Sequence, residues 1–212
     1  MSVLNKIPKS ITFLLGMTIL LGVLYPAAIT LVAQAAFPGA ANGSLLVIKG
    51  AVRGSTLLAQ KFKSPSYFQA RPSATDYAYI GAGASNLGPV SADLAKAVAD
   101  RRVAWQAGFS NEPPIDMLYA SASGLDPDIT LEAALGQARA VAAARSSGSE
   151  SAKLEAKIAA ELRRRAEGAT GLIGPPRLNV VSLNAWLDSV APVTGLPAAE
   201  AIPEPKSAEG GS

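Results

Sequence analysis

The uncharged, apolar run from Ile11 to Phe37 constrains this chain more than any other feature of the sequence. As a continuous α-helix it would be about 40 Å long, against a bilayer hydrocarbon core of about 30 Å. A single span must be helical, because lipid offers no partners to its backbone N–H and C=O groups. The sequence therefore predicts one transmembrane helix over residues 11–37, after a flank of residues 1–10 and before Pro38.

A cleaved signal peptide is the alternative interpretation of this run. Ala33-Gln34-Ala35 matches a small-residue cleavage pattern, and Lys6 and Lys9 would form the basic region before the apolar core. The apolar core of a signal peptide has about 7–15 residues. Because this run is far longer, its length favours a membrane anchor.

The flanking charges predict how the anchor is oriented. Lys6, Lys9 and the terminal amine lie close to one end, whereas the first charges beyond the other end are Lys49 and Arg53. Short flanks orient a span, and long domains translocate largely regardless of their own charge. We therefore expect a cytoplasmic N-terminus and an extracytoplasmic domain.

Five small or polar residues recur every fourth position along the run: Thr18, Gly22, Pro26, Thr30 and Gln34. Pro26 has no N–H and leaves the carbonyl of Gly22 without its helical partner. Small residues allow helices to approach closely, and Thr and Gln can hydrogen-bond between helices. Such residues are also common in membrane helices, but a helix facing only lipid gains nothing from this set. We predict that this ridge docks against other membrane helices.

The composition removes most kinds of catalytic site. The chain contains neither Cys nor His, which excludes disulfides, thiol nucleophiles, the usual zinc ligand sets and Ser-His-Asp triads. Its net charge of +3 has a local source in Arg163-Arg164-Arg165. On a helix these side chains spread around the surface, so a solvated face is favoured over a nucleic-acid interface.

The remaining pattern predicts an α+β fold: a single N-terminal transmembrane helix, one soluble mixed α/β domain over 38–190 and a disordered C-terminal tail over 191–212. Helix caps are available at Ser91, at Asp128 or Thr130, and at the capping box Ser147–Glu150. We expect strands over 45–48, 56–58 and 178–181, an ordered loop over 64–89, and helices over 91–106, 131–145, from the capping box to 167, and over 182–187.

Two motifs invite a chemical interpretation. The stretch from Gly81 to Gly88 is glycine-rich, but it lacks the Gly-Lys-Ser/Thr ending of a phosphate loop and the spacing of a dinucleotide fingerprint. Asp126-Pro127-Asp128 brings two carboxylates together, although Pro and Asp also favour helix starts. The residues therefore predict no active site, and we expect a non-catalytic protein.

Several segments, in this order, resemble the KdpC family of accessory subunits of the Kdp-type potassium-transporting ATPase. They are LLGVLYPAAITLVAQAAFP, ANGSL, GS-x-LLAQ-x-F, YFQARPSA, ASNLGP, ASASGLDPDI with Gln137 and Arg145 downstream, and GPPRLNVVSLNAWLD. They extend from the anchor to about Asp188, and the tail lies outside the resemblance. The resemblance implies a single-pass protein of the bacterial inner membrane.

The resemblance also implies partners and a role. The partners are a channel-like potassium-binding subunit, a P-type ATPase subunit that hydrolyses ATP, and a small single-helix subunit. Members of this family are described as catalytic chaperones that raise the affinity of the ATPase subunit for ATP. Gln137 would contact the nucleotide, with Ser123, Gly124, Leu125 and Asp126 beside it. ATP would be a transient ligand, with no tightly bound cofactor.

This role conflicts with the expected topology, because ATP is cytoplasmic. The alternative is an extracytoplasmic cap at the outer mouth of the potassium-conducting subunit, without ATP contact. Gln137 then has a plain explanation as a polar-face position of the helix 131–145, where replacement by alanine has little effect. Two other classes are an anchored carboxylate-based hydrolase and a module that binds a ligand in the aromatic loop Tyr67–Tyr79.

Overall fold

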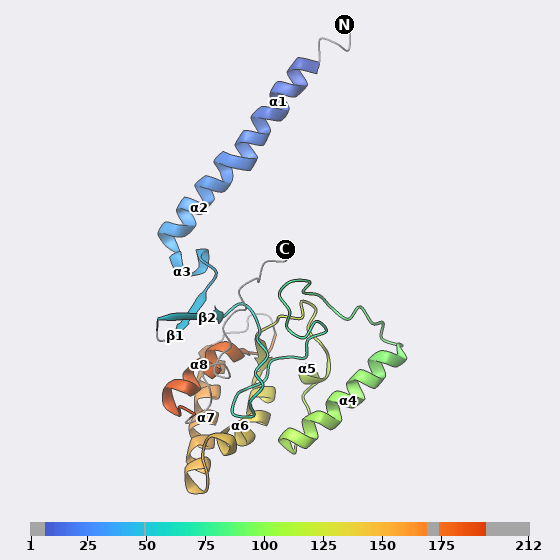
Figure 1. The fold of residues 1–212 in the computed structure, drawn as a ribbon, viewed down its shortest axis with the longest axis vertical. Coiled ribbons are helices and arrows are strands. Elements are labelled where there is room, and N and C mark those ends of the chain that lie inside the picture. The colour runs from blue at the N-terminus through green and yellow to red at the C-terminus, as the bar shows by residue number, and fades with distance from the viewer. Residues whose placement is uncertain (1–6, 49, 169–173, 194–212) are drawn as a thin grey trace, which may run out of the picture. The chain divides into compact units, whose positions relative to one another are not determined.

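The computed structural model describes residues 7–48, 50–168 and 174–193. The chain divides into two compact units, Met1–Leu45 and Leu46–Ser212. The first contains the apolar helix and the second contains most of the soluble domain (Figure 1). The expected disordered tail, 191–212, lies outside the described residues from 194 onward. The predicted fold class is confirmed.

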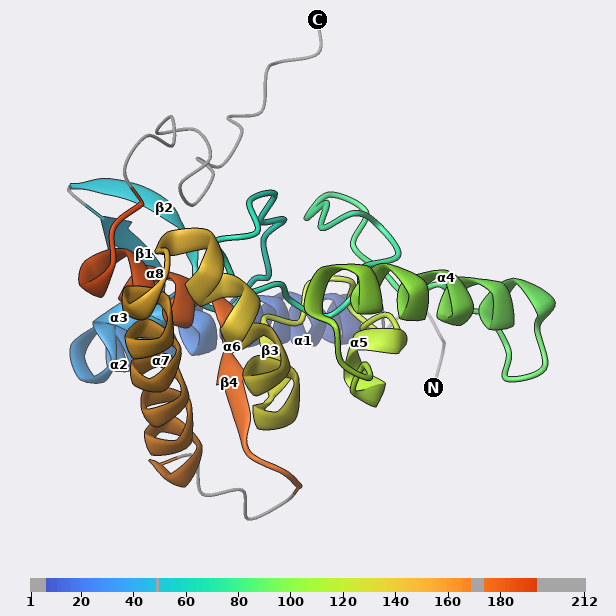
Figure 2. The same cartoon turned by 90° about the horizontal axis from the view of Figure 1, so that it is seen from below.

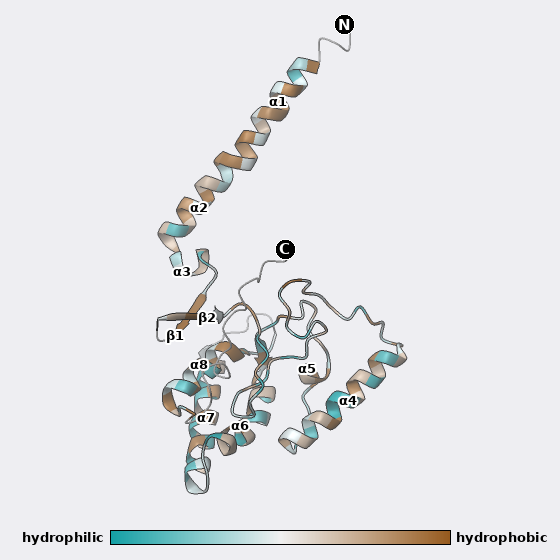
Figure 3. Ribbon diagram, in the orientation of Figure 1, coloured by the Kyte–Doolittle hydropathy of each residue, from teal (hydrophilic) through white to brown (hydrophobic). Residues whose placement is uncertain are grey.

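The apolar run forms one uninterrupted helical rod, made of α1 (Ile7–Ile19), a π-helical turn η2 (Leu20–Leu24) and α2 (Tyr25–Ala36). It is long and apolar enough to cross a membrane, and none of its most apolar window is buried within the chain. Figure 3 shows hydrophobic residues along its whole length. The helix begins four residues earlier than expected, at Ile7, and ends at Phe37 as predicted.

The π-turn explains how the helix accommodates Pro26. The N–H of Tyr25 donates to the carbonyl of Leu20, five residues back, in place of the usual four. A proline inside a helix lacks an N–H, and its ring collides with the carbonyl four residues before it. Widening the preceding turn relieves this collision without breaking the rod. The sequence predicted the unpaired carbonyl but not the π-turn.

The end of the rod is fixed by a pair of side-chain amides. After α2, the chain turns through the short helix α3 (Pro38–Ala41). Gln34 and Asn42 then donate to each other through their side-chain amides, with both distances 3.1 Å. Asn42 also donates to the carbonyl of Pro38 at 2.7 Å. Gln34 is therefore bonded within its own chain.

The domain combines helices with two small sheets (Figures 1 and 2). One sheet pairs β1 (Leu45–Ile48) with β2 (Ala51–Ser55), and the other pairs β3 (Asp128–Thr130) with β4 (Arg177–Asn179). The second pair is antiparallel, with Ile129 opposite Leu178. The helices are α4 (Ala92–Phe109), α5 (Ile115–Leu118), α6 (Leu131–Arg145), α7 (Ser149–Gly168) and α8 (Val180–Val190).

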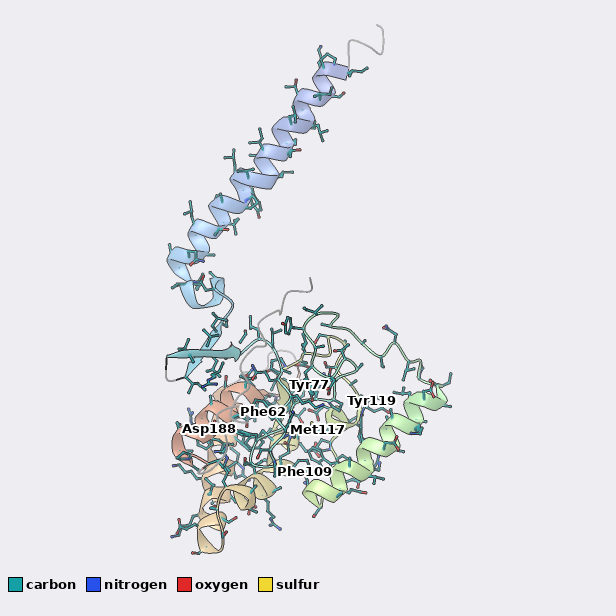
Figure 4. The ribbon with its side chains drawn as sticks, in the orientation of Figure 1. Phe62, Tyr77, Phe109, Met117, Tyr119 and Asp188 are labelled. Carbon is teal, nitrogen blue, oxygen red and sulfur yellow. The ribbon has the colours of Figure 1, made fainter. Side chains whose placement is uncertain are left out.

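The core lies where α6, α7 and α8 pack around the β3–β4 pair. Both views place these three helices side by side, with α4 next to α5 (Figures 1 and 2). Ile158 and Leu162 of α7 are fully buried, as their four-residue spacing predicted. Phe62 and Met117 come from segments far apart in the sequence and are also buried in this core (Figure 4).

The expected elements agree with most of this structure. The strand 45–48, the helix 131–145 and its Thr130 cap are confirmed, and the helix capped by Ser91 extends to Phe109. The expected strand 56–58 is wrong, because β2 already ends at Ser55. The expected strand 178–181 is half wrong, because Asn179 accepts a hydrogen bond from Ser182 and starts α8 at Val180.

Candidate functional site

The centre of the domain is built around an extended segment, Ser66–Gln69, which we call the central segment. Two fully buried amides bind its backbone. Asn184 of α8 accepts from the Phe68 N–H at 2.9 Å and donates to the Phe68 carbonyl at 3.0 Å. Gln137 of α6 accepts from the Gln69 N–H at 2.7 Å and donates to the Gln69 carbonyl at 3.2 Å. These side chains replace the neighbouring strands that would satisfy a buried extended backbone in a sheet.

Arg145, the last residue of α6, holds the other side of the central segment. Its side chain is fully buried. Nε donates to the Ser66 carbonyl at 2.7 Å, Nη1 donates to the Ala191 carbonyl at 2.6 Å, and Nη2 pairs with Asp188 at 2.9 Å. The guanidinium also lies over the Tyr67 ring, 4.8 Å from its centroid. The planar, five-donor fork of arginine fits this arrangement, which joins α6, the central segment and the end of α8.

Tyr67 completes this network. Its hydroxyl donates to the second carboxylate oxygen of Asp188 at 3.0 Å. Burial, followed by the negative charge of Asp188, raises the pKa of Tyr67 to about 12. The hydroxyl therefore stays protonated as a donor throughout the physiological pH range. The predicted aromatic binding loop is wrong in this part, because Tyr67 and Phe68 belong to the core.

The polar-face interpretation of Gln137 is also wrong. Gln137 lies on the buried side of α6, next to Ala134, Ala138 and Val141. Both ends of its side-chain amide are bonded to the backbone of Gln69. A contact between this amide and a nucleotide would require those bonds to break.

The other residues of the implied nucleotide site lie elsewhere, beside an open cavity of 470 Å³. Ser123, Leu125 and Asp126 line it, together with Arg71 and with Leu57, Leu58, Ala122 and Pro127. Gln137 is not among the described residues that line this cavity. The structure therefore separates the predicted set into an open surface group and one buried residue.

Gly124 is fixed by its surroundings and not by a ligand. Its φ of +70° lies in the left-handed region, which strains residues with a side chain. A Cβ there would lie 2.8 Å from the Thr75 hydroxyl and 2.9 Å from the Gly83 carbonyl. Gly124 therefore allows the loop before α4 to approach the segment 121–127.

The two carboxylates of Asp126-Pro127-Asp128 do not form an acid–base pair. Asp126 accepts from Arg71 at 2.9 Å and from the Asp128 N–H at 3.0 Å. Asp128 accepts from Asn179 at 3.0 Å and lies in β3, so the expected helix start at this position is wrong. Both carboxylates are occupied by structural bonds, and the structure offers no support for a carboxylate hydrolase here.

The ridge of the apolar helix is exposed at all five positions, from Thr18 to Gln34. In a regular α-helix, five positions spaced by four would drift by about 160° around the axis. The π-turn adds one residue to a single turn, which removes about 100° and leaves roughly 60°. The π-turn therefore gathers the ridge onto one side of the rod.

Comparison with known proteins agrees with the arrangement of anchor and domain. Residues 7–189 match the model of the family described as "KdpC: K+-transporting ATPase, c chain". The potassium-transporting ATPase KdpC subunit of Geobacter sulfurreducens is 43% identical over 194 residues, covering 89% of this chain and 100% of the relative. The KdpC subunit of Allorhizobium ampelinum is 43% identical over 192 residues, covering 88% and 97%. The chain therefore belongs to the KdpC family of potassium-transporting ATPase subunits.

Proposed function

We propose that this chain is a non-catalytic assembly subunit whose membrane helix docks, through the ridge Thr18–Gln34, against helices of its partner subunits. The observation that carries the proposal is the π-turn, which aligns five exposed small or polar residues on one side of an otherwise apolar rod. Close packing of small residues drives helix association in lipid, where the hydrophobic effect between helices is absent. The partners that we propose are the channel-like potassium-binding subunit, the P-type ATPase subunit and the small single-helix subunit.

The proposed position of the domain is outside the cytoplasmic face of the bacterial inner membrane. The basic flank before the helix supports this orientation, as does the length of the domain that follows. There the domain would cap the outer mouth of the potassium-conducting subunit.

A second candidate function is the family role of a chaperone for ATP binding. The open cavity beside Ser123 and Asp126 supports it, because Arg71 provides a cationic group at its wall. Two observations weigh against it. The guanidinium of Arg71 is already paired with Asp126, and Gln137 is buried in the core.

Chemical labelling of intact cells distinguishes the two candidates. Ser147 is exposed in the turn between α6 and α7, and the chain has no native Cys. We expect Ser147→Cys to react with a membrane-impermeant maleimide in intact cells, because the long domain follows the short basic flank across the membrane. The measurement is the labelled fraction before and after lysis.

The control is Ser2→Cys at the other end of the anchor, which should react only after lysis. The opposite pattern, with Ser147→Cys labelled only in lysed cells, would place the domain in the cytoplasm and favour the chaperone role.

Substitutions along the helix test the ridge. Gly22→Leu adds a large side chain to the ridge, where a Cβ meets nothing of this chain within 4 Å. The variant should insert normally, yet its recovery with the other subunits should fall by about tenfold, because the partner helix can no longer approach closely. The measurement is the ratio of subunits recovered by a tag on this chain.

Gly16→Leu is the matched control. A Cβ at Gly16 also meets nothing within 4 Å, and this residue is on the same helix but not on the ridge. Equal losses in the two variants would mean that the ridge has no special part in docking.

A further inference from the structure

One surface segment of the domain combines exposure with a complete lack of charge. The sequence contains no charged residue between Asp76 and Asp93. Within this stretch Ile80 is 76% exposed, Leu87 38% and Val90 97%. We call residues 80–90 the strap. Apolar side chains this exposed are common singly, but several on one uncharged segment mark an interaction surface.

The backbone of the strap is as exposed as its side chains. Residues 82–88 form no helix, strand or turn. Among the described residues, no backbone N–H of the strap donates to another backbone carbonyl. The glycines Gly81, Gly83 and Gly88 have no atom within 4 Å of the position that a Cβ would occupy. The strap therefore presents peptide groups as well as apolar side chains to a partner.

Both ends of the strap are held by the domain. Just before it, the Tyr77 N–H donates to the Ser73 hydroxyl at 2.9 Å, and the Tyr77 hydroxyl donates to the Arg71 carbonyl at 2.9 Å. Just after it, the Ser91 hydroxyl caps α4. A segment held at both ends loses less conformational entropy when it binds than a free tail does.

The chemistry of the strap selects the class of partner. Segments that bind membrane surfaces combine apolar residues with Lys or Arg for anionic lipids, and the strap has neither of these cations. The buried centres of protein–protein interfaces are depleted in charge, and their polar groups pair across the contact. We propose that the strap docks against an uncharged surface of a neighbouring protein subunit of the potassium pump. This inference rests on the proposed role as an assembly subunit.

Site-specific photo-crosslinking in native membranes tests the proposal. A photoreactive amino acid replaces Leu87 in one variant and Ile80 in another, and the whole complex is then purified by a tag on this chain. Both positions should crosslink to one protein subunit. The control is Val103 on α4, which is 68% exposed and should give no crosslink to that subunit.

A charge substitution gives an independent measurement. Leu87→Asp should reduce the recovery of partner subunits by about tenfold or more, because a charge is then buried in the contact. Val103→Asp should leave the recovery unchanged. If the wild-type chain recovers no partner, the proposed assembly role fails. If it recovers the complex but the strap crosslinks only to lipid, to nothing, or no better than Val103, the strap inference alone is overturned.

Discussion

Replacement of Arg145 by methionine is expected to lower the free energy of unfolding by about 3–5 kcal/mol. The substitution keeps the buried aliphatic volume but removes the donors to Ser66, Ala191 and Asp188, which lie 2.6–2.9 Å away. The carboxylate of Asp188 then loses its cation, and two carbonyls lose their donor. The measurement is denaturant-induced unfolding of the full-length chain in detergent, followed by near-ultraviolet circular dichroism.

Two variants make this result specific. Arg139→Met is on the same helix, but the Arg139 side chain is 85% exposed and its ion pair with Glu155 is long, at 3.4 Å. We expect it to change the free energy of unfolding by less than about 1 kcal/mol. Arg145→Lys keeps the charge but not the planar fork, so an intermediate loss is expected. If Arg145→Met and Arg139→Met have the same effect, Arg145 does not support the core.

The anchor shows how far residue patterns lead. Its length and lack of charge predict one span, and the structure contains one such helix over Ile7–Ala36 among the residues it describes. The π-turn was not predicted, although Pro26 is its visible cause. The missing N–H of a proline can be accommodated by a kink, by water or by a widened turn, and the sequence does not select among these.

The domain shows a second limit. The bounds of α6 follow from its Thr130 cap and its apolar stripe, which are local signals. The central segment depends on Asn184, which is more than a hundred residues away in the chain, so no local pattern can reveal it. Gln137 is an intermediate case. It lies three residues after Ala134 and four before Val141, so helical periodicity alone places it on the buried stripe.

Gln137→Ala is therefore expected to destabilise the domain by at least about 2 kcal/mol, whereas a polar-face residue would give less than about 0.5 kcal/mol. The substitution leaves the N–H and the carbonyl of Gln69 without the partners that now lie at 2.7 and 3.2 Å. Each buried polar group left without a partner costs about 1–3 kcal/mol. Alanine has the better helix propensity, so the helix itself does not account for the loss. Gln106→Ala, the same change at an exposed position of α4, is the matched control.

The same variant tests the family role of Gln137. If its amide binds ATP in the assembled pump, Gln137→Ala should raise the half-saturating ATP concentration by about 10–100-fold, since hydrogen bonds to charged groups contribute about 1.5–3 kcal/mol. If the amide only supports the central segment, complexes that still contain this chain should hydrolyse ATP with unchanged half-saturation, while the isolated chain unfolds more easily. Unfolding of the isolated chain and ATP-dependent hydrolysis by the complex therefore report on different roles. Normal stability together with a tenfold weaker dependence on ATP would contradict the structural role and favour a direct contact with the nucleotide.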